Sequence, residues 1–339
     1  MDVRQILKDL TVGAGVSGCE YEIAPTAEKY LEKYGRVHID TLGNVILEKD
    51  GKGDGILLDA HTDMVGMIVT SITPEGFLRV DACGHIDTRP LGAQQVTIHG
   101  KEPLVGVVIS TPPHLQKGDS EHNGMKMSDV LIDTGLPKEK VARLVGLGDR
   151  VTVNSEFTQL LGDRVSCCAL DDRAGMASLI YAMEILEEKG CDKKVTVSFS
   201  TREEVGGSGA KTAAFNASTK ELIAVDVSFA DTPDSNSEEC GELSKGPMIG
   251  VSSSLDYEMS QRFIDTAEKC GIPYQLEIMG GRTGTNADSM TVAKGGFVSG
   301  LISIPLRYMH TGVEVVSVAD VENTGRLIAE YIAGGNENA

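Results

Sequence analysis

Seven acidic or histidine side chains stand at the ends of apolar segments, where an α/β protein places its ligands. They are His61 and Asp63 in "ILLDAHTDMVG", Asp171 in "CCALDDRAG", Glu203 and Glu204 in "VSFSTREEVGGSGA", Asp226 in "LIAVDVSFAD" and His310 in "RYMHTGVEV". Carboxylates with one imidazole for each metal are typical of a site for two divalent cations. In such a site one glutamate of the adjacent pair binds metal, and its neighbour is free to act as a base.

Each of these motifs also has a plain structural explanation when it is taken alone. Side chains two residues apart on a strand face the same way, so we expect Asp63 to accept the second ring N–H of His61 or to lie beside it near a metal. The alternative is a buried histidine that pairs with an aspartate for packing. Asp226 follows a largely apolar run, and a lone buried acid is costly unless it is paired or bound to a metal.

The acids at 171–172 and 203–204 have structural alternatives as well. Asp171 and Asp172 precede a predicted helix, where carboxylates cap free N–H groups. Glu203 and Glu204 belong to a chain with 50 acidic residues, and acidic pairs usually lie in water. All of these explanations would have to hold together to dismiss the whole set, so the sequence favours a metal site.

The segments that must position these residues alternate between strands and helices. Apolar runs predict strands, and apolar residues at helical spacing predict helices between them. The predicted strands are 55–69, 194–201, 221–229 and 296–303, and the predicted helices are 173–190, 255–271 and 317–333. This order predicts an α/β fold with a mixed, mostly parallel sheet covered by helices.

The segment 70–162 differs from the rest of the chain in its pattern of apolar and turn-forming residues. It contains short β-rich runs such as "GFLRVDA", "QQVTIHG" and "LVGVVIS", separated by Gly, Pro and Asp. Short strands with frequent turns are typical of a small β-barrel or a sandwich. We therefore expect residues 1–69 and 163–339 to form one discontinuous domain, with 70–162 as an inserted β-rich domain.

Composition limits the class of protein further. A chain of 339 residues suggests two domains, and a net charge of −19 argues against nucleic acid as a partner. An odd number of cysteines, seven, forms no disulfide framework and indicates a reducing cytoplasm. The N-terminus lacks the apolar core of a signal peptide, and no stretch reaches the roughly 18 apolar residues of a membrane span, so we expect no membrane partner.

The six motifs "AHTDMVG", "CCALDDRAG", "STREEVGGSGA", "VDVSFADTP", "GRTGTNADS" and "IPLRYMHTGVEVV" occur in an order that resembles a known family. The family is that of the tetrahedral aminopeptidases, which are cobalt- or zinc-dependent metallopeptidases. Some relatives are named glutamyl aminopeptidases and others endoglucanases. The resemblance spans essentially the whole chain. It implies a zinc-peptidase-like fold and a homo-oligomer, typically a dodecamer, that uses the inserted domain 70–162 for its contacts.

The resemblance also implies how the candidate residues divide two metal ions between them. By this reading His61 and Asp226 bind one ion, Glu204 and His310 bind the other, and Asp171 bridges both. Zinc or cobalt is expected, with manganese as a further option. The implied reaction is the release of amino acids from peptides with a free N-terminus.

Further roles follow from the same resemblance. Glu203 would be the general base, and Asp63 the partner that orients His61. The peptide bond between Asp171 and Asp172 would be cis, with Asp172 as a structural support. In the Gly-rich segment "MGGRTGTNADS", Arg282 would contact a substrate carboxylate.

The sequence departs from the family pattern at two positions outside the expected ligands. Met64 stands where many relatives have Glu, and Asn286 stands where they have Asp, so Asn286 is expected near the substrate pocket. Two other activities are alternatives: a metal-dependent deacylase of N-acyl amino acids and an endoglucanase. The absence of Trp and the adjacency of Glu203 and Glu204 argue against a glycosidase, whose carboxylates flank the sugar bond. A non-catalytic assembly protein is disfavoured because every expected ligand is present.

Overall fold

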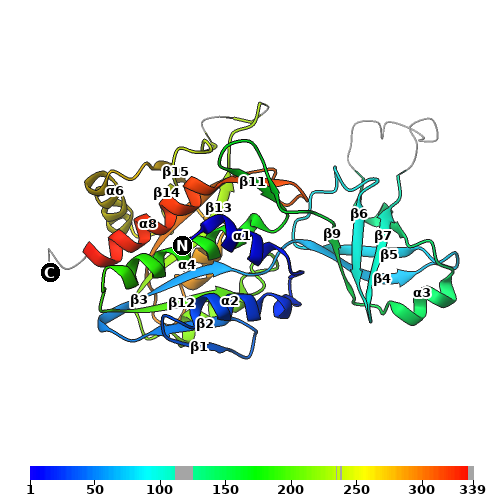
Figure 1. Ribbon diagram of the computed structural model, residues 1–339, viewed down its shortest axis with the longest axis horizontal. Coiled ribbons are helices and arrows are strands. Elements are labelled where there is room, and N and C mark those ends of the chain that lie inside the picture. The colour runs from blue at the N-terminus through cyan, green and yellow to red at the C-terminus, as the bar shows by residue number, and fades with distance from the viewer. Residues whose placement is uncertain (111–124, 234, 237–238, 335–339) are drawn as a thin grey trace.

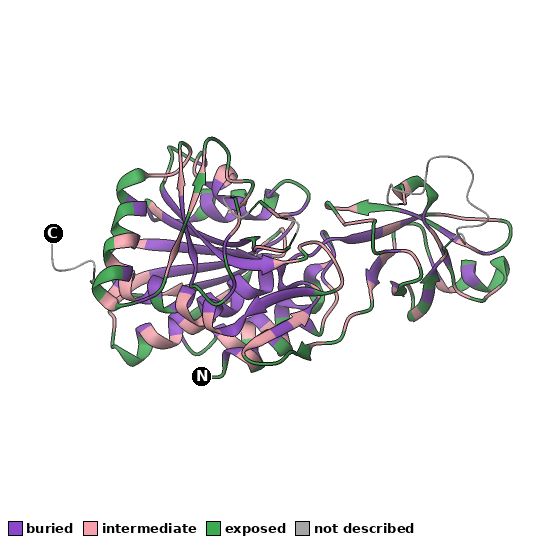
Figure 2. Ribbon diagram, turned by 90° about the horizontal axis from the view of Figure 1, so that it is seen from above, coloured by how far each residue is buried: buried purple, intermediate pink, exposed green. Residues whose placement is uncertain are grey.

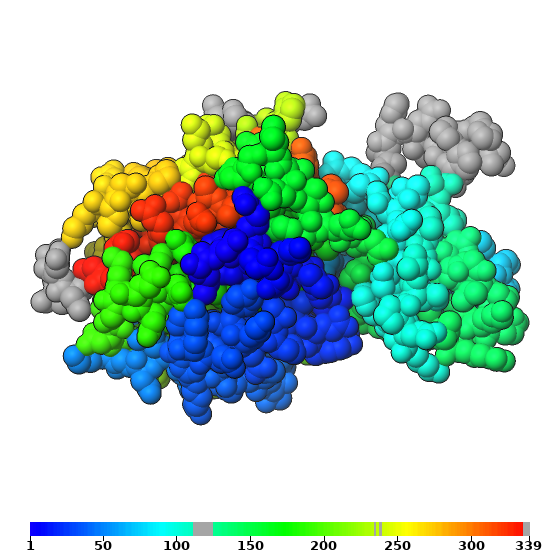
Figure 3. Space-filling model, viewed as in Figure 1, coloured from blue at the N-terminus to red at the C-terminus, as the bar shows by residue number. Residues whose placement is uncertain are grey.

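The structure is a computed structural model that describes residues 1–110, 125–233, 235–236 and 239–334. It is elongated, with a large α/β body and a small β-barrel at one end (Figure 1). The space-filling view shows the N-terminal and C-terminal parts of the chain together on the body, while the middle of the chain builds the barrel (Figure 3). The chain therefore leaves the body once and returns to it.

The body is organised around one large mixed sheet, which has 11 strands within the described residues. Its centre consists of four strands that pair in parallel. In spatial order they are β12 (Lys193–Ser200), β3 (Lys52–His61), β13 (Glu221–Phe229) and β16 (Val298–Arg307). All four carboxyl ends lie at the same edge of the sheet, which is where an open α/β sheet binds its ligands.

Antiparallel strands extend this parallel centre. On one side lie β2 (Val45–Lys49) and β1 (Arg36–Ile39). On the other side lie β17 (Glu314–Ser317), β11 (Arg164–Cys167) and β10 (Thr158–Gln159). A branch from β16 adds β14 (Met248–Ser252) and β15 (Gln275–Met279). The prediction of a mixed sheet with a parallel core is confirmed.

Helices cover both faces of the sheet because its central strands carry apolar side chains on both faces. On β3, Leu58 packs into the core beneath α4, and its neighbour Leu57 packs with Ala210 and Ala214 of α5 on the opposite face. The first face carries α1 (Val3–Thr11), α2 (Ala24–Leu31), α4 (Leu170–Glu188), α6 (Tyr257–Cys270) and α8 (Val318–Gly334). The second face carries α5 (Ser208–Asn216) and α7 (Asn286–Met290). The buried strands run between these two layers (Figure 2).

The segment between β3 and β10 folds into a closed barrel, so the alternative of a sandwich is wrong. Its strands, in spatial order, are β4 (Gly66–Ile72), β5 (Leu78–Cys83), β8 (Leu131–Asp133), β7 (Pro103–Val108), β6 (Gln95–His99) and β9 (Arg150–Val153). The barrel has a separate apolar core that includes Met67, Val96, Ile98 and Ile132. The short helix α3 (Lys138–Leu144) packs against β4. Two 3-10 turns, Glu20–Glu22 and Met127–Asp129, complete the described elements.

The predicted single strand 55–69 is wrong in one respect: it is split between two sheets. β3 ends at His61, Thr62 still donates its N–H to Ser200, and Met64 then donates its N–H to Gly15 instead of to the large sheet. The next strand starts at Gly66, where an added Cβ would lie 2.5 Å from a methyl of Val16. The chain therefore changes direction within 62–65.

The expected division into two domains differs in detail from the strand pairing. The barrel strands begin at Gly66 and end at Val153, and β10, inside the expected insertion, pairs with β11 of the large sheet. The division at residues 70 and 162 stays a prediction. None of the helices in the described residues has the length and apolar character needed to cross a membrane.

Candidate metal centre

The fold brings the candidate residues of five distant segments to one edge of the sheet. His61 is the last residue of β3, and Asp226 lies near the end of β13. Glu203 and Glu204 follow β12, and His310 follows β16. Asp171 reaches the same edge from the start of α4. The reason is topological, since parallel neighbouring strands must end on the same side.

Three of these residues form a first group of candidate ligands. His61, Asp171 and Asp226 each offer one ligand atom, and these atoms lie within 4.8 Å of one another. The His61 Nε2 atom is 3.0 Å from Asp171 Oδ1 and 3.7 Å from Asp226 Oδ1. All three residues are buried, so an ion at this position would be largely surrounded by protein.

A second group shares Asp171 with the first. Its members are Asp171, Glu204 and His310, again with ligand atoms within 4.8 Å of one another. The His310 Nε2 atom lies 3.3 Å from Asp171 Oδ2 and 3.5 Å from Glu204 Oε1. The two oxygens of Asp171 thus face two different imidazoles.

Each histidine has a main-chain oxygen behind its ring. The Nδ1 atom of His61 is 2.9 Å from the carbonyl oxygen of Asp63, and Nδ1 of His310 is 3.0 Å from the carbonyl oxygen of His85. Because a carbonyl only accepts, each Nδ1 must be protonated to use this contact. Nε2 then faces Asp171. In the metal-free protein a protonated ring donates its Nε2–H to that carboxylate, and loss of this proton leaves the Nε2 lone pair that a metal ligand requires.

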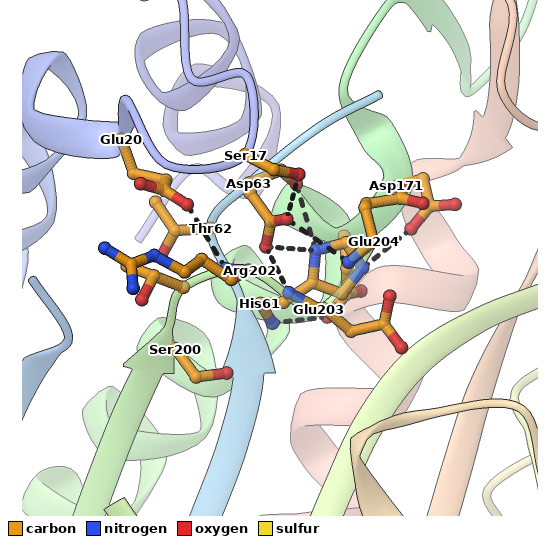
Figure 4. A network of polar contacts seen from close by, with 12 residues as sticks. Ser17, Glu20, His61, Thr62, Asp63, Asp171, Ser200, Arg202, Glu203 and Glu204 are labelled. Atoms are coloured by element: carbon orange, nitrogen blue, oxygen red, sulfur yellow. Dashed lines mark hydrogen bonds and ion pairs between the residues drawn. The ribbon is translucent and has the colours of Figure 1, made fainter. Parts of the chain in front are cut away.

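Asp63 serves a different set of partners from the one expected. Its Oδ1 atom is 3.6 Å from His61 Nδ1, so the ring is bonded by the main chain of Asp63 and not by its carboxylate. The reason is that β3 ends at His61, and the two side chains no longer alternate on one strand. The carboxylate accepts Ser17 Oγ at 2.6 Å, the N–H of Glu203 at 2.9 Å and the N–H of Glu204 at 3.2 Å. Figure 4 shows Asp63 between these three residues.

The charges of this cluster suit divalent cations. The carboxylates of Asp171, Glu203, Glu204 and Asp226 and the imidazoles of His61 and His310 line one groove, which also contains His85, Glu239 and Glu277. Burial raises the pKa of both Glu204 and Asp226 well above the usual range, and nearby carboxylates raise it further. Glu204 Oε1 is buried without a hydrogen-bond partner. The donor set therefore fits two divalent ions, which would compensate the surplus of negative charge.

Asp171 and Glu203 respond to this environment in opposite ways. Burial alone would raise the pKa of Asp171, but the hydrogen bonds to His310 and His61 outweigh burial and hold its pKa well below the usual range. Burial raises the pKa of Glu203 to about 7, and the carboxylates of Asp171 and Asp63 add to that effect. Glu203 is therefore poised for proton transfer near neutral pH, a property typical of a general base.

Asp172 lies behind the cluster and belongs to neither group of candidate ligands. The peptide bond that joins it to Asp171 is cis. Its carboxylate accepts the N–H of His61 at 3.2 Å and the N–H of Gly175 at 3.0 Å. These contacts match the supporting position that was expected for Asp172.

Asn286 directly follows Thr285, which lines the groove, but is itself buried beside it. It is 4% exposed and donates to Asp59 Oδ2 and Ser200 Oγ, both at 2.9 Å. Its influence on the substrate pocket stays a prediction. Arg282 from the same Gly-rich segment does line the groove.

Sequence reasoning missed one residue that contacts the candidate ligands. Glu314 accepts the N–H of Asp171 at 3.2 Å and the N–H of His310 at 2.9 Å, and it is 2% exposed. It opens the apolar run "EVVSV", so it carries the same signal that singled out Asp226: an acid beside buried strand residues.

Comparison with known proteins identifies the family of this chain. The family of M42 glutamyl aminopeptidases matches residues 43–327. The lysyl aminopeptidase of Pyrococcus furiosus is 32% identical over 329 residues, which cover 95% of this chain and 94% of that protein.

Solved structures give the same result. The TET aminopeptidase of a marine sediment Thaumarchaeota archaeon is 31% identical, with a TM-score of 0.92 over 98% of this chain and 96% of that one. The TET1 peptidase of Pyrococcus horikoshii, which can assemble into a tetrahedron or a large octahedral shell, is 32% identical, with a TM-score of 0.83 over 97% of this chain and 98% of that one. The chain therefore belongs to the M42 glutamyl aminopeptidase family of metallopeptidases and is a hydrolase that acts on peptides.

Proposed function

We propose that this chain is a two-metal aminopeptidase that releases N-terminal amino acids from peptides. His61 and Asp226 would hold one ion, Glu204 and His310 the other, and Asp171 would bridge them. The observation that carries the proposal is the position of Asp171, whose two oxygens lie 3.0 Å from His61 Nε2 and 3.3 Å from His310 Nε2. A carboxylate between two imidazoles supports a bridging ligand in a two-metal site.

The identity of the ions is proposed from their ligands. Oxygen and imidazole nitrogen donors suit zinc or cobalt, with manganese as a further option. When bound, two such ions supply Lewis acidity toward the peptide carbonyl and lower the pKa of water at the site.

Glu203 is proposed as the proton carrier of the reaction. With its pKa raised to about 7 by burial, its carboxylate can accept the proton of the attacking water, and its acid form can return that proton to the leaving amine. The hydrogen bond from its N–H to Asp63 orients the loop that bears it. Asp63 is therefore proposed to have two supporting roles. Its carboxylate holds this loop, and its main-chain carbonyl holds the His61 ring.

The substrates are proposed to be peptides with a free N-terminus. The candidate ligands and Glu203 lie at one part of a groove that also contains Arg282. The acidic part favours an α-ammonium group, and Arg282 favours a carboxylate of the same peptide.

Assembly and location are further parts of the proposal. We propose that residues 1–69 and 163–339 form the catalytic domain and that 70–162 is a domain inserted into it for oligomerisation. The enzyme is proposed to form a homo-oligomer, with a tetrahedral dodecamer as the largest assembly considered. The assembly of the similar TET1 peptidase supports this. A cytoplasmic location is proposed because all seven cysteines, each within the described residues, are free thiols.

The test is metal reconstitution with matched substrates. The protein is stripped with a chelator, titrated with zinc, cobalt or manganese, and assayed on aminoacyl anilides beside N-blocked anilides, N-acyl amino acids and cellulose. We expect two ions to bind per chain and metal-dependent cleavage of the free-amine substrates alone. Cleavage of N-acyl amino acids instead would point to the deacylase, and chelator-resistant activity on cellulose would overturn the proposal.

A further inference from the structure

Glu314 lies beside the candidate metal centre. It does not line the groove that contains all six residues of the cluster, but it lines an adjoining cavity together with Asp171, Glu204 and His310. It is the first residue of β17, where it pairs with Cys167 of β11, and its side chain is 2% exposed. Within the described residues it forms no ion pair. A buried carboxylate without a cation is costly, so the groups that do bond to it must account for its position.

Those groups are backbone amides of two candidate ligands. Glu314 Oε2 accepts the N–H of Asp171 at 3.2 Å, and Oε1 accepts the N–H of His310 at 2.9 Å. Asp171 and His310 come from the start of α4 and from the loop after β16, which are far apart in the sequence. One carboxylate therefore joins the two backbones whose side chains face each other at 3.3 Å.

The backbone of His310 requires such support. His310 has φ +64, the left-handed conformation, although it is not a glycine. Side chains disfavour this conformation, and it persists where surrounding contacts fix it. Glu314, four residues further along the chain, accepts the N–H of His310. This contact fixes the direction in which the imidazole projects from the backbone.

The first group of ligands has a separate support. The N–H of His61 is bonded by Asp172, not by Glu314. The two buried carboxylates thus divide the centre: Asp172 supports His61, while Glu314 supports His310 and the shared Asp171.

We propose that Glu314 is a positioning residue for the metal position formed by Glu204, His310 and Asp171. The inference rests on the proposed two-metal function and deepens it, because it assigns the geometry of one position to a residue that binds neither metal nor substrate. Loss of Glu314 should weaken the binding of one ion far more than the binding of the other.

The experiment compares Glu314→Gln with a matched control. In glutamine the amide NH₂ meets one of the two N–H groups as a donor, so one contact is lost. Asp320 is 0% exposed and likewise accepts two backbone amides, those of Ser244 at 2.6 Å and Gly246 at 2.8 Å, neither of which is a candidate ligand. Asp320→Asn therefore reproduces the loss of a buried carboxylate away from the centre.

Metal-free wild type and both variants are titrated calorimetrically with cobalt(II), and the visible cobalt spectrum is recorded. For Glu314→Gln we expect at least a tenfold weaker affinity for one ion, a much smaller loss of affinity for the other, which shares only Asp171 with it, and activity that recovers at high cobalt concentration. Asp320→Asn should lower the Tm but bind both ions as the wild type does. Equal effects of the two variants, or wild-type affinities in Glu314→Gln, would overturn the proposal.

Two further variants keep the test decisive. Glu314→Asp retains the charge but is one methylene shorter; if Glu314→Gln does not fold, the same selective loss in Glu314→Asp decides the question. In a His310→Ala background, Glu314→Gln should cause a smaller additional loss than in the wild type, because the part of its effect that acts through the His310 imidazole is already gone and only the part that acts through Asp171 is left. The wild-type titration tests the two-metal function and the variant comparison tests Glu314, so each can fail separately.

Discussion

The Oδ1 atom of Asp63 accepts the backbone N–H of Glu203 at 2.9 Å. The second oxygen of the same carboxylate accepts the N–H of Glu204 at 3.2 Å and the hydroxyl of Ser17 at 2.6 Å. One fully buried side chain thus fixes the loop that presents both glutamates. The proposed base and the proposed ligand beside it depend on a single anchor.

Asp63→Asn should therefore disturb both glutamates at once. The amide NH₂ would meet an N–H donor, and an unsatisfied buried group costs about 1–3 kcal/mol. We expect a lower Tm together with a fall in kcat and in metal affinity. Ser17→Ala, which removes only the hydroxyl contact, is the control and should retain most of the activity; an Asp63→Asn enzyme with wild-type kcat would contradict the anchor.

Substitution of Glu203 and of Glu204 should affect different properties of the enzyme. Glu203→Gln should lower kcat by about 10²–10⁴-fold, because general acid–base catalysis contributes that much, while the protein still binds two ions. Glu204→Gln should instead lower the affinity for metal. Calorimetric titration and steady-state kinetics on the same preparations distinguish the two, and a fully active Glu203→Gln variant would refute the assignment of the base.

The metal-free protein should lose stability as the pH rises. The pKa of Glu203 is raised from 4.5 to about 7, so between these values the folded state binds more protons than the unfolded state. Stability conferred by the protonated form is complete below pH 4.5 and is lost through about pH 7, a change of up to about 3 kcal/mol. Denaturant unfolding of chelated protein from pH 4.5 to 8 measures it, and Glu203→Gln should show a smaller slope.

The buried pair formed by Asn286 and Asp59 can be tested by adding a charge and then exchanging the two side chains. The Asn286 Nδ2 atom donates to Asp59 Oδ2 at 2.9 Å, and burial raises the pKa of Asp59 to about 6. Asn286→Asp would set two buried carboxylates side by side, so we expect a loss of about 3 kcal/mol at neutral pH that diminishes in acid.

The double variant Asp59→Asn, Asn286→Asp exchanges the two groups and serves as the control for that loss. It should recover most of the lost stability, as measured by urea unfolding. If the double variant is less stable than Asn286→Asp alone, the hydrogen bond between the two side chains is not the source of the effect.

The strand ends could be predicted from the sequence because the signal is local. Apolar runs that end in an acid or a histidine identified His61, Asp226 and the Glu203–Glu204 pair, and the parallel topology then brought them together. The proposed bridging role of Asp171 came from the family resemblance instead, since an Asp at a helix start is more often a cap.

The supporting contacts could not be predicted in the same way. Glu314 and the carboxylate of Asp63 bond to backbone amides of residues distant in the sequence, and no periodicity records such a contact. The break after His61 was missed because apolar residues stand on both sides of the polar stretch 59–63, and only the pairing of Met64 with Gly15 shows that the strand has ended. The hydrogen bonds of Asn286 to Asp59 and Ser200 could not be predicted for the same reason, since they join residues distant in the sequence.

The main-chain oxygen of His85 that bonds to His310 Nδ1 lies in the connection that follows β5 of the barrel, and Asp87 in the same connection donates its N–H to the carbonyl of His310. The barrel therefore supplies part of the architecture around the metal centre. A shortened chain, with the barrel replaced by a linker, would lose the acceptor that selects one tautomer of His310. The smallest portion of this protein that preserves an intact centre must include the barrel.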